Sequence, residues 1–345
     1  MKLMGRACWL LVSATGCSVS AFAQHGPSLS MPLDCALGSA CIVQNYVDRD
    51  PGPEARDYRC GFLTYDGHKG TDFRVVDQEV FRRGVAVLAA APGVVRALRD
   101  GMPDVNARDR GKEAVSGREA GNSVVIDHGD GWETQYAHLR QGSVVARRGE
   151  AVKAGQKLGL VGLSGNTEFP HLHFEVRYQR KTIDPFVGAG AAEACKAGAR
   201  ALWRERLQGE LAYVATGLLN MGIAATPPKL KDSNVDPAQM AQFTDASPAA
   251  VFWVQIYGAR ENDLEELRLL APDGRPLVRR EDRISRNRAQ WLVYSGLRRP
   301  EGGWTSGTYR GEYTLYRGAQ RDEILRVTHE VRLPPQATKE RGEPK

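Results

Sequence analysis

Short apolar runs separated by glycine-containing turns dominate residues 58–187. The runs are five to eight residues long and rich in β-branched side chains, and they occupy residues 85–90, 94–98, 122–127, 134–139, 159–163 and 171–178. Runs of this length, bounded by Gly, Asp and Asn, are typical of β-strands joined by turns. The pattern therefore predicts an antiparallel sheet domain over residues 58–187.

A charged stretch at residues 99–120 interrupts this domain. It is rich in Gly, Arg and Asp and poor in apolar residues, which favours a long surface loop. Such a loop is either a lid over a nearby site or an inert insertion.

The pattern changes between residues 188 and 246, where apolar residues recur at steps of three and four. This spacing predicts a helical segment followed by a polar linker. The apolar stretch at 211–225 has 15 residues and contains Asn220, so we expect a packing helix and no membrane span.

The β pattern resumes over residues 247–334, with turns such as Pro272-Asp273-Gly274 between the runs. It predicts a smaller β-sandwich of immunoglobulin-like type. Residues 335–345 are rich in proline and charge and are expected to be disordered. The fold class is therefore mainly β.

The N-terminus resembles a targeting segment. Lys2 and Arg6 precede an apolar stretch, and Ala21-Phe22-Ala23 has the small-x-small pattern of a cleavage site. We expect a signal peptide at 1–23, with a buried N-terminal helix or a lipoprotein processed at Cys17 as alternatives. Residues 24–57 are rich in Pro, Gly and Asp and are predicted to be irregular.

Two of the six cysteines lie in the expected signal peptide, and the others are Cys35, Cys41, Cys60 and Cys195. Four cysteines, an even number, in an exported protein indicate two disulfides, for which three pairings exist. We favour Cys35–Cys41, which closes a tight loop, and Cys60–Cys195, which ties the start of the sheet domain to its end.

Composition narrows the class of protein. The 345 residues are 42% hydrophobic and 26% charged, which excludes a collagen-like, wholly disordered or coiled-coil chain. The formal net charge is +6. No basic run with interleaved aromatic residues occurs, so nucleic acid is not an expected partner.

The candidate chemistry lies in three histidine clusters of the sheet domain. His171 and His173 project from one face of an expected strand, because residues two apart share a face. Leu172, Phe174 and Val176 mark the opposite face as core. The histidine face is therefore expected to line a cleft or to meet water.

The other two clusters surround His68 and His138. His68 and Asp72 lie four residues apart where a glycine-rich loop enters a strand, and His138 ends an expected strand. Two imidazoles and one carboxylate that leave the fourth position open are the ligand composition of a catalytic zinc site.

Four motifs carry a family resemblance. They are His68-x-Gly70-x-Asp72-Phe73; His128-Gly129-Asp130-Gly131-Trp132-x-Thr134-x-Tyr136-Ala137-His138-Leu139; Gly162-x-Ser164-Gly165-Asn166-Thr167; and His171-Leu172-His173-Phe174-Glu175-Val176-Arg177. Their order and spacing resemble those of the lysostaphin-type (LytM-like) zinc endopeptidases. The resemblance covers about residues 60–187.

The resemblance implies one Zn²⁺ ion held by His68, Asp72 and His173, with His138 and His171 as the non-ligand catalytic histidines. It implies an endopeptidase that uses a zinc-activated water on peptidoglycan crosslinks or stem peptides. We favour His171 as the base and His138 as the oxyanion stabiliser. All five positions are present, which favours an active enzyme.

Two alternatives differ in function. One is a non-catalytic envelope protein that binds wall peptides or activates an amidase, and the other is a zinc protease of ordinary proteins. The expected location is the periplasm, with secretion as the alternative. The C-terminal β domain either docks on wall polymer or on an envelope protein partner, or it is a rigid structural cap.

Overall fold

The computed structural model describes residues 26–189, 195–198, 200–229 and 235–335. The expected signal peptide, with Cys8 and Cys17, and nearly all of the expected disordered tail lie outside these ranges. Within them, no helix has the length and hydropathy needed to cross a membrane.

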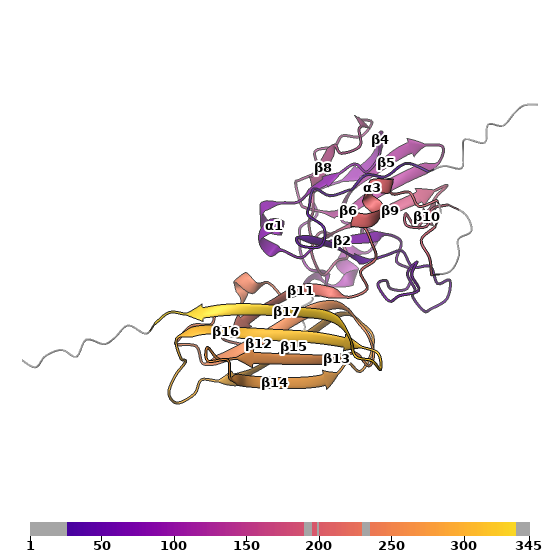
Figure 1. The fold of residues 1–345 in the computed structure, drawn as a ribbon. Coiled ribbons are helices and arrows are strands. Elements are labelled where there is room, and N and C mark those ends of the chain that lie inside the picture. Colours follow the sequence, from indigo (N-terminus) through magenta and orange to yellow (C-terminus); the bar gives the residue numbers. More distant parts are fainter. Residues whose placement is uncertain (1–25, 190–194, 199, 230–234, 336–345) are drawn as a thin grey trace, which may run out of the picture.

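The chain is mainly β and forms two lobes (Figure 1). In the described residues, the first lobe contains an eight-stranded antiparallel sheet of order β1-β2-β9-β6-β5-β4-β7, with β10 paired to β9. These strands are β1 (Cys41–Asn45), β2 (Thr71–Val75), β4 (Gly93–Arg99), β5 (Asn122–Gly129), β6 (Trp132–Leu139), β7 (Ala151–Val152), β9 (His171–Tyr178) and β10 (Lys181–Ile183). A second, two-stranded sheet pairs β3 (Ala86–Leu88) with β8 (Lys157–Leu160). The antiparallel sheet predicted for this part of the chain is confirmed.

Strand β9 lies inside the sheet, between β2 and β6. Leu172, Phe174 and Val176 are at most 1% exposed and face the hydrophobic core, as their alternation predicts. The intervening residues of β9 therefore share the opposite face of the sheet.

The prediction that residues 24–57 are irregular is wrong for β1. This short strand pairs antiparallel with β2 and forms the edge of the sheet. Its five residues lie in a segment rich in turn formers, so the strand is defined by its pairing partner more than by its own sequence.

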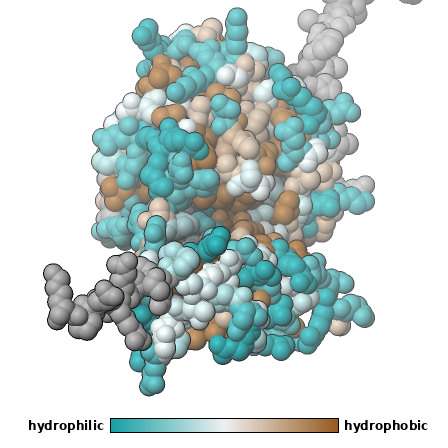
Figure 2. Space-filling model, turned by 60° about the vertical axis from the view of Figure 1, so that its left-hand side comes forward, coloured by the Kyte–Doolittle hydropathy of each residue, from teal (hydrophilic) through white to brown (hydrophobic). Residues whose placement is uncertain are grey.

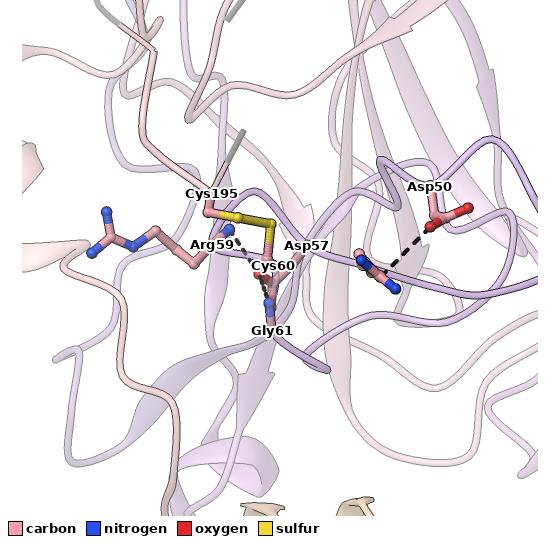
Figure 3. The surroundings of a disulfide bond; sticks show 7 residues. Asp50, Asp57, Arg59, Cys60, Gly61 and Cys195 are labelled. Atoms are coloured by element: carbon pink, nitrogen blue, oxygen red, sulfur yellow. Dashed lines mark hydrogen bonds and ion pairs between the residues drawn. A yellow bond between two sulfur atoms is a disulfide. The ribbon is translucent and has the colours of Figure 1, made fainter. Parts of the chain in front are cut away.

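Both favoured disulfides are present. Cys35 pairs with Cys41, six residues away, and Cys60 pairs with Cys195, 135 residues away. Figure 3 shows the second bond beside Asp57, whose Oδ1 accepts hydrogen bonds from the backbone N–H groups of Arg59 and Gly61 at 2.8 Å each. The loop that carries Cys60 is therefore held at both the sulfur atom and the backbone.

Asp184 is a second buried carboxylate, close to the end of the first lobe. Its Oδ1 accepts a hydrogen bond from the N–H of Phe186 at 2.9 Å, and its Oδ2 lies 4.0 Å from Nη1 of Arg49. Among the described residues, Oδ2 accepts no hydrogen bond. Burial raises the pKa of this carboxyl from 3.8 to about 6.

We expect Asp184→Asn to stabilise the protein above pH 6 and to have little effect at pH 4. The folded-state pKa of about 6 lies above the ordinary 3.8, so wild-type stability falls as the pH rises between these values. At ~1.36 kcal/mol per pKa unit, the full difference is about 3 kcal/mol. Denaturant unfolding at pH 4 and pH 8 measures it, with Asp273→Asn in an exposed turn as the control. An equal effect of Asp184→Asn at both pH values would contradict the prediction.

The helix predicted within residues 188–246 is largely wrong. Among the described residues, the segment contains the six-residue α3 (Glu205–Glu210), the 3₁₀ turn η3 (Pro237–Gln239) and a strand, β11 (Gly217–Ala224). Gly217 and Gly222 weaken helix propensity in β11, and pairing with β12 (Ala249–Ala259) satisfies its backbone. Tertiary pairing thus overrides the helical spacing of its apolar residues.

The second lobe consists of two antiparallel sheets, with orders β11-β12-β15 and β14-β13-β16-β17. The remaining strands are β13 (Leu264–Leu270), β14 (Pro276–Arg283), β15 (Arg288–Arg298), β16 (Gly307–Arg317) and β17 (Asp322–Leu333). Residues from both sheets, including Phe252, Leu267 and Tyr313, share one hydrophobic core. This lobe includes β11, which lies before the expected start at 247, and the charged edge strand β14. The immunoglobulin-like classification stays a prediction.

The two lobes meet through apolar and charged contacts. Leu37, Ile42 and Val43 of the first lobe line an apolar pocket together with Leu218 and Leu325 of the second. Figure 2 shows mostly hydrophilic side chains on the visible face of the second lobe and hydrophobic ones near the junction. α1 (Gln78–Arg83) also contributes an ion pair, between Nη1 of Arg82 and Oδ2 of Asp236 at 3.0 Å.

Candidate metal centre

Three neighbouring strands and one loop bring the candidate residues together. Asp72 lies on β2, His171 and His173 lie on β9, and His138 lies at the end of β6. Asp72 is directly opposite His173 in the β2–β9 ladder, so the two side chains share a face of the sheet. His68, in the loop before β2, completes the group.

The ligand atoms of His68, Asp72 and His173 converge. Oδ1 of Asp72 lies 3.1 Å from Nε2 of His68 and 2.9 Å from Nδ1 of His173, and the two nitrogens are 3.2 Å apart. His68 and Asp72 are 3% and 2% exposed. The three potential ligand atoms thus lie close enough together for one divalent cation to contact all of them. A cation at this place would also offset the repulsion between their lone pairs.

Backbone carbonyls fix the tautomers of three of the histidines. Nδ1 of His68 lies 2.6 Å from the carbonyl oxygen of Tyr46, and Nδ1 of His138 lies 2.8 Å from that of Ser164. Nδ1 of His171 lies 3.0 Å from the carbonyl oxygen of Phe169. Because a carbonyl oxygen only accepts, Nδ1 donates in each case, and the neutral ring keeps its lone pair on Nε2.

The protonation states agree with this arrangement. Burial alone would raise the pKa of Asp72, but His68 and His171 hold it well below its ordinary value. Burial opposes the charged form of His68, whereas Asp72 raises its pKa above the ordinary value. Burial and the neighbouring rings of His171 and His173 lower the pKa of His138 well below 6.5. Asp72 is therefore ionised at neutral pH, and His138 is neutral.

A second group of potential ligands shares one member with the first. His138, His171 and His173 also have ring nitrogens within 4.8 Å of one another. Only the group of His68, Asp72 and His173 includes a carboxylate, whose charge compensates a divalent cation better than a third neutral imidazole.

The backbone conformation of His138 determines where its ring lies. Ala137 is opposite His173, so strand alternation would place Tyr136 and His138 together on the core face. His138 has φ 62°, which breaks the alternation, and its ring lies 4.7 Å from that of His171. The hydroxyl of Tyr136 remains in the core, where it accepts a hydrogen bond from Ala90. Tyr136 is therefore a packing residue, as its place on the strand suggests.

Gly70 allows His173 to occupy its position. A Cβ atom built at Gly70 would lie 2.6 Å from Cε1 and 2.7 Å from Nε2 of His173. Any larger residue would push the imidazole away, so this position requires glycine.

The 99–120 stretch lies mostly at the surface, as expected, but it is not without secondary structure. It contains the short helix α2 (Ala107–Arg110) and the 3₁₀ helix η2 (Lys112–Val115). The N–H of Ala107 donates to the carbonyl oxygen of Thr167, and the carbonyl oxygen of Ala120 accepts from the N–H of His138, both at 2.9 Å. The stretch is thus held beside the site by backbone hydrogen bonds, and the lid and the inert insertion both stay predictions.

A cleft of about 320 Å³ lies over the histidines. Its walls come from the His68 loop, the end of the 99–120 stretch, β6, the turn at residue 166 and β9. Its lining residues are Tyr65, Gly67, His68, Lys69, Glu119, Ala120, Gln135, His138, Asn166, His173 and Glu175.

Two further histidines and Ser164 lie outside the groups of potential metal ligands. His128 contacts the carbonyl oxygen of Pro92 at 2.6 Å and Oγ1 of Thr134 at 2.8 Å. Ser164 donates to the carbonyl oxygen of Leu139 at 2.7 Å. His329 lies on β17 in the second lobe, away from the cluster.

Sequence reasoning missed Asn45 and Tyr46. Nδ2 of Asn45 donates to Oδ2 of Asp72 at 2.9 Å, and Tyr46 supplies the carbonyl oxygen that binds His68. Both contacts depend on the pairing of β1 with β2, which the pattern of residues 24–57 does not show.

Comparison with known proteins supports the resemblance. The profile described as Peptidase family M23 matches residues 66–185. In this part, the chain is therefore similar to the M23 (LytM-like) peptidases, as the four motifs suggest.

Two curated relatives match parts of the chain. "Cell division protein DipM" of Caulobacter vibrioides is 40% identical over 94 residues, and "Peptidoglycan DD-endopeptidase ShyB" of Vibrio cholerae is 42% identical over 65 residues. The matches cover 25% and 19% of this chain and 15% of each relative. Among solved structures, the catalytic domain of the M23 protein EnpA from Enterococcus faecalis is 24% identical with a TM-score of 0.32, and the match covers 44% of this chain and 95% of that one.

Proposed function

We propose that the M23 peptidase domain is a zinc-dependent endopeptidase that hydrolyses peptide bonds in peptidoglycan crosslinks or stem peptides. One observation carries this proposal: ligand atoms of His68, Asp72 and His173 converge beneath a cleft, with two further histidines beside them. The name of one relative, a peptidoglycan DD-endopeptidase, supports the substrate class.

In this proposal His68, Asp72 and His173 are the metal ligands. A bound Zn²⁺ ion would supply Lewis-acid chemistry, which acidifies water and polarises a carbonyl group. The ionised Asp72 supplies negative charge to the site, and the Nδ1–H bond of His68 to Tyr46 directs its Nε2 lone pair inward.

His171 is the proposed general base. Its Nδ1–H is held by the carbonyl oxygen of Phe169, so Nε2 is available to accept a proton from the attacking water. Nε2 lies 3.4 Å from Oδ1 of Asp72, which stabilises the imidazolium that forms. His171 can then return the proton to the leaving amine.

His138 is the proposed stabiliser of the tetrahedral oxyanion. Its Nδ1–H is committed to Ser164 and its ring rests in the neutral form, so it donates to the oxyanion from Nε2 after it has taken up a proton from solvent water. Its ring and that of His171, 4.7 Å apart, thus face the same reacting group from adjacent strands.

The proposed location is outside the cytoplasm, with the periplasm favoured. The two disulfides support an oxidising compartment.

The test is digestion of purified peptidoglycan sacculi, with fragments identified by mass spectrometry. We expect new peptide amino termini that disappear after chelation and return when Zn²⁺ is added. Cleavage of casein in place of sacculi would support a protease of ordinary proteins. Binding to sacculi without any cleavage would support a non-catalytic envelope protein.

A further inference from the structure

We infer that strand β1, which lies outside the matched M23 region, is part of the metal site and that Asn45 is a positioning residue for Asp72. This inference rests on the proposed function. It assigns a role in metal binding to a segment far from the histidine motifs in sequence.

A β-bulge allows β1 to reach the site. The β1–β2 register shifts between Val43 and Asn45, which places Asn45 opposite Asp72. The extra residue, Gln44, accepts a hydrogen bond through Oε1 from Nη1 of Arg74 at 2.7 Å. Two consecutive polar side chains of β1 thus bind the same face of β2, because a bulge redirects side chains that would otherwise alternate.

Asn45 holds one oxygen of the Asp72 carboxylate. Its Nδ2 donates to Oδ2 at 2.9 Å, and the two residues are 5% and 2% exposed. Oδ1 is then the oxygen that faces His68 and His173. A carboxylate bound in this way presents one oxygen to a cation and cannot rotate to offer both.

The same strand leads directly to the contact with a second proposed ligand. Tyr46 follows β1, and its carbonyl oxygen accepts from Nδ1 of His68. The N–H of Asp48 donates to the carbonyl oxygen of His68 at 2.8 Å, and Oδ2 of Asp48 accepts from the N–H of Gly67 at 2.9 Å. Residues 45–48 thus fix both Asp72 and the His68 loop, and Asn45 is the member whose contact with a ligand uses its side chain.

The test measures metal binding by full-length Asn45→Ala. Competition with a chromogenic chelator gives the Zn²⁺ dissociation constant, which we expect to rise about 10–100-fold, the usual cost of losing a partner that orients a metal ligand. The matched control is Asn122→Ala. Asn122 is fully buried in the same lobe and donates to the carbonyl oxygens of Met102 and Leu139, but to no proposed ligand. Its loss should leave the Zn²⁺ affinity unchanged even if it lowers the melting temperature.

A spectroscopic readout separates positioning from general stability. Co²⁺ in place of Zn²⁺ reports coordination through its visible bands, which weaken when a fifth ligand binds. We expect weaker bands in Asn45→Ala, because Asp72 becomes free to bind through both oxygens. If Asn45→Ala does not fold, Asn45→Ser keeps a polar group too short to reach Oδ2 and carries the same expectation.

The outcomes separate the two proposals. Unchanged Zn²⁺ affinity and Co²⁺ bands in a folded Asn45 variant would overturn the role of Asn45. Equal loss of affinity in Asn122→Ala would also overturn it, because the effect would then be one of fold stability. Failure of the wild-type protein to bind either metal would instead contradict the proposed function.

Discussion

Asp72→Ala and His173→Ala are each expected to lower the rate of peptide hydrolysis by about 10³-fold or more. Each change removes one of three converging ligand atoms, and metal-assisted stabilisation of developing charge is worth several kcal/mol. Release of fragments from sacculi gives the rate, and metal analysis of the purified variants gives the Zn²⁺ content, which should fall in parallel.

His329→Ala is the matched control for these variants. It removes an imidazole from the second lobe and should retain both the rate and the metal content. Retention of full activity by Asp72→Ala would exclude the proposed ligand set. Loss of activity with wild-type metal content would indicate that these residues act on the substrate instead.

Removal of the Cys60–Cys195 bond is the second change for which we expect a large effect, here on the stability of the first lobe. The bond closes a loop with a sequence separation of 135, and a cross-link of this span stabilises a fold by about 5 kcal/mol in the chain-entropy description. Cys60→Ser with Cys195→Ser should therefore lower the free energy of unfolding of the first lobe by about 3–5 kcal/mol. Denaturant unfolding followed by tryptophan fluorescence measures the change.

The Cys35–Cys41 bond provides the comparison within the same lobe. Its separation is 6 residues, so Cys35→Ser with Cys41→Ser should cost about half as much in the same description. Equal losses from the two double variants would contradict the loop-length argument and indicate that local contacts around each bond dominate.

The sequence predicts the central strands well because their pattern and their packing agree. On β9 the histidines alternate with Leu172, Phe174 and Val176, and the structure buries the apolar set as expected. His138 is different, since simple alternation would direct its ring into the core. Only its left-handed backbone brings the ring to the site, and this conformation depends on neighbours that are distant in sequence.

The secondary-structure predictions fail for elements whose conformation is determined by pairing with another strand. β11 has the apolar spacing of a helix but is a strand beside β12, and β14 is an edge strand too charged to stand out in the pattern. β1 is hidden in a segment rich in turn formers, which also hid the contact of Asn45 with Asp72. Each element depends on a partner strand that a local pattern does not reveal.

The hydrogen bond between the N–H of His138 and the carbonyl oxygen of Ala120 has a consequence for engineering and for divergence of the domain. Shortening the β4–β5 connection to a tight hairpin would release the backbone of a proposed catalytic residue, so the connection and the reaction chemistry must change together. Side chains that line the cleft can then be exchanged to alter substrate preference, whereas the number of residues in the β4–β5 connection is constrained.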